Sequence, residues 1–237
     1  VGKDDTVIEI GVGAGTLTAA LSDAAKRVIG FEIDRRLQPV LAETLKGRDN
    51  VEIVFADVMK IPTEEIVEKA GGRFSVVANL PYYITTPVLM KFLEDCAFVD
   101  LIAVTVQEEV ADRICAKPSS ADYGALTLAA DFRGNAEKVM RIPRELFLPS
   151  PNVDSAVAVI RIDSEKYVGA DETAFRNVVR SAFSSRRKTL VNNLMQSFGL
   201  SREKAEEAVT AVKGDKLARG ETLSTAEFVE LSKIITL

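Results

Sequence analysis

The chain has 237 residues, of which 47% are hydrophobic and 27% are charged, and its net charge is −5. This composition is typical of a globular protein, and no apolar run is long enough to span a bilayer. Two cysteines exclude a disulfide framework, and the absence of histidine excludes Ser-His-Asp and Cys-His catalysis and disfavours a metal site. We therefore expect a cytoplasmic protein, without membrane or metal partners, whose chemistry comes from carboxylates, amides, hydroxyls, aromatics or a cofactor.

Short apolar runs alternate with helical stretches along the first part of the chain. The runs predict strands at Thr6–Ile10, Arg27–Phe31, Val51–Phe55, Phe74–Ala78 and Leu101–Val106. The stretches predict helices at Thr16–Ala25, Arg35–Lys46, Pro62–Ala70, Pro87–Glu94, Glu108–Ala116 and Gly124–Phe132. Such alternation indicates an α/β fold with a doubly wound, mostly parallel sheet. Two later strands, Ala136–Ile142 and Ser155–Ile162, are expected to close the sheet as an antiparallel pair.

After Asp163 the pattern becomes wholly helical. Helices are predicted at Glu172–Phe183, Lys188–Phe198, Arg202–Val212 and Ser224–Ile235. We expect two domains, residues 1–166 and residues 167–237. The charge also divides there, since residues 1–165 carry 18 Lys and Arg against 26 Asp and Glu, whereas residues 166–237 carry 12 against 9. The second domain can therefore offer a local phosphate-binding face.

A Gly-rich turn follows the first predicted strand and opens a helix. Its glycines, Gly11, Gly13 and Gly15, allow backbone N–H groups to approach a ligand closely. The dinucleotide fingerprint G-x-G-x-x-G would place glycine where Thr16 stands. The spacing G-x-G-x-G, together with Glu9, favours S-adenosylmethionine over a nicotinamide cofactor. The alternative is a glycine turn that only packs a helix on a strand.

Acidic residues end the next two predicted strands. Glu32 is placed to accept hydrogen bonds from ribose hydroxyls, and Asp57 is placed to bind the amine of a cofactor adenine. Either residue alone could be a solvated loop carboxylate, but three consecutive strand ends with such groups favour a cofactor site. Asp34 either shares the ribose role or caps the next helix, and we favour the cap.

The tetrapeptide Asn79-Leu80-Pro81-Tyr82 follows the fourth predicted strand, where open α/β sheets hold their ligands. It offers a side-chain amide, backbone carbonyls beside a proline, and an aromatic ring. This set can hold the edge of an amine-bearing base and stack on its face. The alternative is an ordinary loop with a turn-forming proline.

Together these residues resemble the motifs of class I S-adenosylmethionine-dependent methyltransferases that act on an adenine amine. The resemblance narrows to the KsgA-type small-subunit ribosomal RNA adenine N6,N6-dimethyltransferases through further signatures: Gln107–Val110, Tyr123–Leu126, Phe147–Pro151, Val153–Val157, and Phe183 with Arg186–Leu190. It runs from about residue 6 to the C-terminus. It implies a Rossmann-like catalytic domain with a seven-stranded sheet and a small all-α C-terminal domain. The family's usual N-terminal segment is absent, so we expect an N-terminally truncated chain.

The resemblance implies methyl transfer from S-adenosylmethionine to N6 of two adjacent adenosines in the 3′-terminal hairpin of small-subunit rRNA, within an assembling subunit. Asn79 and the Leu80 carbonyl are expected to orient the amine, Pro81 belongs to the same clamp, and Tyr82 and Phe147 are expected to sandwich the base. Phe147 could instead anchor a proline loop in the core. Rival functions are methylation of large-subunit rRNA and a non-catalytic role in assembly.

The basic residues of the second half are expected to contact RNA phosphates. Arg186, Arg187 and Lys188 lie at a predicted helix junction, and Arg113 and Lys117 extend the same surface. A positive run at a helix N-terminus opposes the helix dipole, which a phosphate would relieve. The alternative is a solvated cationic helix start. We expect a monomer.

Overall fold

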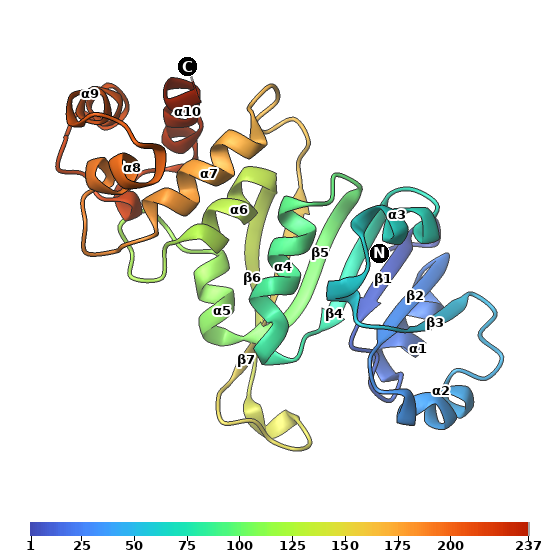
Figure 1. Ribbon diagram of the computed structural model, residues 1–237. Coiled ribbons are helices and arrows are strands. Elements are labelled where there is room, and N and C mark those ends of the chain that lie inside the picture. Colours follow the sequence, from blue (N-terminus) through green and yellow to red (C-terminus); the bar gives the residue numbers. More distant parts are fainter. Residues whose placement is uncertain (237) are drawn as a thin grey trace. The chain divides into compact units, whose positions relative to one another are not determined.

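The computed structural model describes residues 1–236, and its central feature is a seven-stranded sheet (Figure 1). The strands are β1 (Thr6–Ile10), β2 (Arg27–Glu32), β3 (Val51–Phe55), β4 (Phe74–Asn79), β5 (Val99–Gln107), β6 (Gly134–Ile142) and β7 (Ser155–Ile162). Their order across the sheet is β3-β2-β1-β4-β5-β7-β6. The first five strands pair in parallel, and β7 runs antiparallel to β5. The predicted doubly wound, mostly parallel sheet is confirmed.

Ten α-helices occur in the described residues. They are α1 (Thr16–Ala24), α2 (Gln38–Thr44), α3 (Thr63–Ala70), α4 (Thr85–Glu94), α5 (Glu108–Ile114), α6 (Ala125–Arg133), α7 (Glu172–Ala182), α8 (Leu190–Phe198), α9 (Arg202–Lys213) and α10 (Thr225–Thr236). No helix among residues 1–236 is long and apolar enough to cross a bilayer. The helix expected at Arg35–Lys46 is instead a 3₁₀ turn, Arg35–Leu37, followed by α2. Pro39 lies in the first turn of α2, and its missing N–H prevents a bond back to Arg35.

The chain forms two compact units, which are described separately. The first contains residues 1–111 and 135–163 and holds the sheet. Its central strands are buried along almost their whole length, as expected of a parallel sheet with helices on both faces. Phe74 on β4 packs edge-on against Phe92 of α4, with ring centroids 6.2 Å apart.

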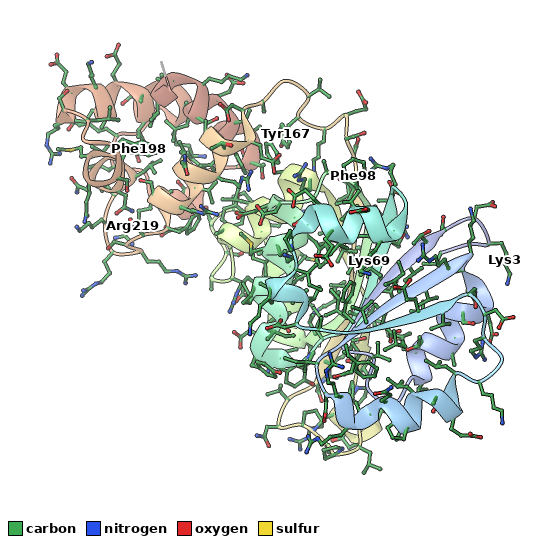
Figure 2. All side chains as sticks on the ribbon, turned by 45° about the vertical axis from the view of Figure 1, so that its right-hand side comes forward. Lys3, Lys69, Phe98, Tyr167, Phe198 and Arg219 are labelled. Atoms are coloured by element: carbon green, nitrogen blue, oxygen red, sulfur yellow. The ribbon has the colours of Figure 1, made fainter. Side chains whose placement is uncertain are left out.

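The second unit contains residues 112–134 and 164–237. The expected boundary at residue 166 is close to residue 164, where the second segment of this unit begins. The unit also includes residues 112–134, so one boundary in the sequence does not separate the two units. Residues around α6, expected in the first domain, contribute to the second unit's hydrophobic core. Phe132 stacks on Phe175 at 4.3 Å and on Tyr167, which is labelled in Figure 2. Leu237, the last residue of the expected domain, lies outside the described residues.

Polar contacts explain why α6 belongs with the helices. The Tyr123 hydroxyl donates to the carbonyl of Leu223 at 2.7 Å, across 100 residues of sequence. Arg133 donates to Glu172 at 2.6 Å. Since α6 is apolar around most of its surface, it needs a core on more than one side. Helical periodicity alone does not show which elements will supply that core.

Candidate active site

The Gly-rich turn joins β1 to α1 at the carboxyl edge of the sheet. Gly11 and Gly13 have φ values of 75° and 58°, in the left-handed region that glycine adopts without strain. The Gly11 N–H donates to the carbonyl of Phe31 at 2.9 Å, which fixes the turn beside β2. A Cβ at Gly13 would meet no atom within 4 Å, so the turn is open to a ligand there.

Two buried carboxylates adjoin this turn. Glu32, only 7% exposed, accepts backbone N–H bonds from Gly13 at 2.9 Å and from Asp34 at 2.8 Å. Glu9 is 1% exposed, and its Oε2 atom has no hydrogen-bond partner within the described residues. Burial raises the pKa of Glu9 to about 7, a shift that Thr18 opposes and the Glu32 charge reinforces. The turn therefore has one carboxylate held by backbone donors and one buried acceptor available to a ligand.

The acids at the next turns have visible capping roles. Asp57 caps a 3₁₀ turn, where its Oδ1 accepts from the Met59 N–H at 3.0 Å, and it remains partly exposed. Asp34 accepts from the Arg36 N–H at 3.0 Å, which matches the cap that we favoured for it. The Arg36 guanidinium and this N–H bond lower the pKa of Asp34 to about 2. The other carboxylate oxygen of Asp57, Oδ2, lies 3.9 Å from Nζ of the exposed Lys60.

The tetrapeptide begins at the last residue of β4. Asn79 is exposed, whereas Leu80 is buried and its N–H donates to the carbonyl of Thr105 on β5 at 3.2 Å. Tyr82 and Ser155 share a hydrogen bond of 2.8 Å between their hydroxyls. These contacts tie the backbone and the aromatic ring to two other strands. The Asn79 side chain is therefore exposed next to residues that are hydrogen-bonded to β5 and β7.

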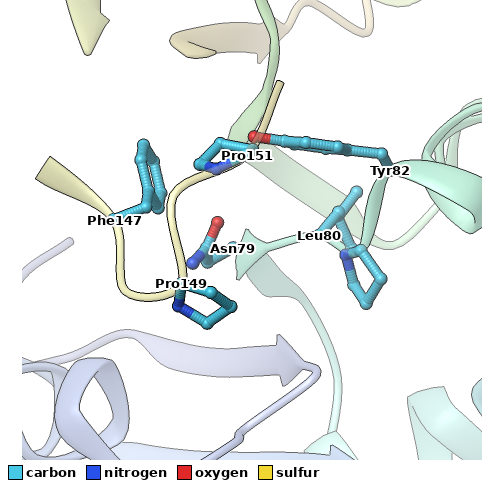
Figure 3. A pocket seen from close by; sticks show the side chains of 7 residues that line it. Asn79, Leu80, Tyr82, Phe147, Pro149 and Pro151 are labelled. Carbon is cyan, nitrogen blue, oxygen red and sulfur yellow. The ribbon is translucent and has the colours of Figure 1, made fainter. Parts of the chain in front are cut away.

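A pocket of about 260 Å³ opens at this point (Figure 3). Its lining joins the tetrapeptide to the loop between β6 and β7 and consists of Asn79, Leu80, Pro81, Tyr82, Phe147, Pro149 and Pro151. Figure 3 shows the Asn79 amide between Tyr82 on one side and Phe147 on the other. Phe147 is half-buried in this lining and is absent from the buried core. This exposure does not match the alternative in which Phe147 anchors a proline loop in the core.

The pocket and the Gly-rich turn lie side by side. A Cβ on Gly11 would lie 3.5 Å from Cδ of Pro81 and 3.8 Å from the carbonyl oxygen of Asn79. A ligand on the turn would therefore end close to a ring held in the pocket. This contact between β1 and β4 brings the two halves of the predicted site together.

The proline loop is held by charged residues that sequence reasoning did not assign. Asp154 accepts from the Arg144 N–H at 3.0 Å and pairs with the Arg141 guanidinium. Arg141 also donates to Glu108 at 3.1 Å. Glu108 and Asp154 lie within the family signatures, but their partners come from another strand. Only the pairing of β5, β6 and β7 shows that they fix this loop.

All five predicted RNA contacts belong to the second unit. Arg186, Arg187 and Lys188 are exposed in the segment between α7 and α8, as the expected helix junction requires. Lys188 donates to Gln196 at 3.0 Å, and the Arg186 guanidinium lies 4.0 Å from the position of a Cβ on Gly124. Lys117 is exposed, and Arg113 is half-buried in α5. The loop before α6 thus approaches the basic segment although some 60 residues separate them in the chain.

The described residues fit S-adenosylmethionine. The turn is open at Gly13, Glu32 is fixed at the end of β2, and the orphaned Glu9 oxygen suits a cationic or N–H-bearing group. The sheet order β3-β2-β1-β4-β5-β7-β6, with a Gly-rich turn after β1 and a carboxylate after β2, defines a class I methyltransferase.

Comparison with known proteins gives the particular family. The model of the family described as ribosomal RNA adenine dimethylase matches residues 1–236. The ribosomal RNA small subunit methyltransferase A of Geobacillus thermodenitrificans is 46% identical over 99% of this chain and 83% of that protein. Its counterpart from Clostridioides difficile is 44% identical over 98% of this chain and 82% of that protein. The chain belongs to the ribosomal RNA adenine dimethylase family.

Solved structures share the fold. A dimethyladenosine transferase from Plasmodium falciparum has the same fold, with a TM-score of 0.81, 24% identity and coverage of 98% of this chain and 90% of that chain. The 23S rRNA methyltransferase ErmE matches with a TM-score of 0.73, 27% identity and coverage of 100% and 93%. The expected enzyme class, an adenine methyltransferase of rRNA with S-adenosylmethionine as methyl donor, is confirmed.

Proposed function

We propose that this chain dimethylates N6 of two adjacent adenosines in the 3′-terminal hairpin of small-subunit rRNA, in an assembling subunit. The pocket beside the Gly-rich turn carries the proposal, because it supports a base site next to the glycines that we assign to the methyl donor. The two relatives that are 46% and 44% identical, both named for the small subunit, support this choice of RNA. We further propose that the protein acts as a cytoplasmic monomer.

Binding of the donor is assigned to the three strand ends. The N–H groups of Gly11, Gly13 and Gly15 already donate within the protein, so these glycines would serve by allowing the donor to approach the backbone closely. The carboxylates of Glu9 and Glu32 would hold its charged and ribose groups. Asp57 would accept from the amine of its adenine, and Asn79 would border its reactive end. The bound cofactor supplies an electrophilic methyl group, so the protein's contribution is position and electrostatics.

Asn79 orients the target amine. Its Oδ1 and the Leu80 carbonyl accept hydrogen bonds from the two N–H groups of the adenine N6, which favours a pyramidal nitrogen with its lone pair directed at the donor. Holding two reactants in line is worth ~7–11 kcal/mol at best. A dedicated base is not required, because the methylated ammonium is far more acidic than an amine and loses its proton after transfer.

Tyr82 and Phe147 hold the adenine after it leaves its stack. Their rings border the Asn79 amide on opposite sides, and the bond to Ser155 fixes the Tyr82 ring. One base–aromatic contact contributes ~1–3 kcal/mol, which offsets much of the cost of unstacking. Pro81 sets the backbone between Leu80 and Tyr82. In the second unit, Arg113, Lys117, Arg186, Arg187 and Lys188 would contact phosphates.

Transfer of labelled methyl groups to purified unmethylated subunits tests the proposal. We expect dimethyladenosine in small-subunit rRNA, at two adjacent positions, and none in large-subunit rRNA. The likeness to a 23S rRNA methyltransferase makes the large subunit the second candidate. Label in large-subunit rRNA would establish that candidate, and binding without any transfer would indicate a non-catalytic assembly factor.

A further inference from the structure

Each aromatic wall of the adenine pocket is followed by a strongly exposed hydrophobic residue. Tyr83, next to Tyr82, is 81% exposed, and Leu148, next to Phe147, is 101% exposed. Leu146, on the other side of Phe147, is 75% exposed. We call Tyr83, Leu146 and Leu148 the apolar rim. Large exposed hydrophobic side chains next to the lining residues of a pocket indicate a binding surface.

The rim does not result from a loose loop. The Ser150 hydroxyl donates to the carbonyl of Arg144 at 2.9 Å, and the Arg144 N–H donates to Asp154 at 3.0 Å. These bonds close the segment between β6 and β7 on itself, and the loop projects beyond the end of the sheet (Figure 1). Leu146 and Leu148 are therefore held in solvent by an ordered backbone.

The charges around the rim are largely paired, so it is not built to bind phosphate. Arg141 pairs with Glu108 and Asp154, and Nε of Arg144 lies 3.2 Å from Oε1 of Glu145. A partner that uses the rim must be recognised through apolar surface. Nucleobases present such surface on their faces, and they stack in a sequence-tolerant way.

The pocket's size points to the same partner. A cavity of about 260 Å³ holds one ring system, whereas the target is part of a polynucleotide. The nucleotides on either side must remain outside the pocket, one backbone step from the base within it. The rim residues are each one position from an aromatic wall of the pocket, and their side chains are exposed.

We infer that the apolar rim packs against the bases that flank the target adenosine and holds them while the target lies in the pocket. This inference rests on the proposed function. It assigns to Tyr83, Leu146 and Leu148 a role in the choice of RNA site that is separate from the phosphate contacts of the second unit and from donor binding.

Binding of unmethylated small subunits and of protein-free small-subunit rRNA, measured at several salt concentrations, tests the inference. We expect the double variant Tyr83→Ser and Leu148→Ser to bind both about tenfold more weakly, because it loses the apolar surface on which flanking bases would stack. The salt dependence and the affinity for S-adenosylmethionine should not change. The variant Tyr83→Phe and Leu148→Met should restore binding.

Phe98 provides a matched control. It is 46% exposed, is labelled in Figure 2 and precedes the amino end of β5, whereas the pocket begins at the carboxyl end of β4. Phe98→Ser should bind RNA as the unchanged protein does, and thermal melting of each variant establishes that it is folded.

Three outcomes would overturn the inference. The double variant binds as tightly as the unchanged protein, its salt slope falls along with its affinity, or it loses affinity for subunits but not for protein-free rRNA. The last result would assign the rim to a ribosomal protein. Failure of the unchanged protein to methylate small subunits would instead reject the proposed function, so the two failures are distinguishable.

Discussion

The two halves of the site at the carboxyl edge of the sheet are built differently. At the ends of β1 and β2 the side chains proposed to bind the donor are buried, with Glu9 at 1% and Glu32 at 7% exposure. At the end of β4 the functional groups are exposed or half-buried, and Asn79 and Phe147 face a pocket open to solvent. The first half suits a small ligand that is enclosed by the protein. The second suits a base that arrives as part of a large molecule.

This difference has an energetic meaning. Burying a carboxylate without a full set of partners costs free energy, which the fold bears at Glu9 and which a bound donor can relieve. An exposed amide at Asn79 costs the folded protein little, so its contribution arises only when substrate is present. Substitutions in the first half should therefore change stability and donor binding, whereas substitutions in the second should change rate and RNA binding.

The largest effect is expected from Asn79→Ala. Loss of one orienting hydrogen-bond partner typically costs ~10²–10³ in rate. We expect a loss of this size in single-turnover methyl transfer, with little change in RNA affinity or stability. Asn152→Ala removes the same group from an exposed loop position and serves as the control. Equal losses in rate and RNA affinity would contradict an orienting role for Asn79.

A pH-dependent effect is expected from Glu9→Gln. Burial raises the pKa of Glu9 from 4.5 to about 7, so the folded state keeps a proton that the unfolded state loses. The ionisation of Glu9 should therefore lower the free energy of unfolding by about 3 kcal/mol as pH rises from 4.5 to above 7. Glu9→Gln lacks this ionisation, so the variant should gain stability relative to the unchanged protein as pH rises.

Urea unfolding of both proteins at pH 5 and pH 8 measures this difference. Other groups titrate in both proteins and cancel in the comparison. If the free energy of unfolding of the two proteins changes in parallel with pH, Glu9 ionises normally. The buried half of the site would then carry no energetic cost at Glu9.

In the open half of the site, two substitutions of Tyr82 distinguish the role of its ring from the role of its hydroxyl. Tyr82→Ala removes the stacking face, and we expect RNA affinity to fall by the ~1–3 kcal/mol of one base–aromatic contact. Tyr82→Phe keeps the ring and removes only the bond to Ser155, with an expected cost of ~0.5–1.5 kcal/mol in stability. If both variants lose the same RNA affinity, the hydroxyl and not the ring face is responsible.

The smallest effect is expected from Arg187→Ala in the second unit. Loss of one phosphate contact should weaken RNA binding at low salt and reduce the slope of log K against log salt by about 1. Binding of S-adenosylmethionine, measured by calorimetry, should be unchanged. Arg73→Ala is a control at an exposed arginine that pairs with Asp100 in the first unit. An unchanged salt slope for Arg187→Ala would contradict the proposed contact between Arg187 and a phosphate.

Much of the fold could be predicted from the sequence because its signals are local. Apolar runs such as Thr6–Ile10 and Val51–Phe55 became strands with the expected limits. The cap before α10 is equally local, since Ser224 forms it with Glu227 through bonds of 2.7 and 3.3 Å. These features depend on residues a few positions apart, so a linear pattern contains them.

The sequence alone determined which groups stand at the strand ends: the glycines, the two carboxylates and the amide with its aromatic neighbour. Tertiary structure decided which of them meet. Gly11 lies beside Pro81, Tyr82 bonds to Ser155 across 73 residues, and α6 joins the helical unit. Such contacts arise from strand order and core packing, which depend on the whole chain at once. The pocket and its apolar rim exist only because of them.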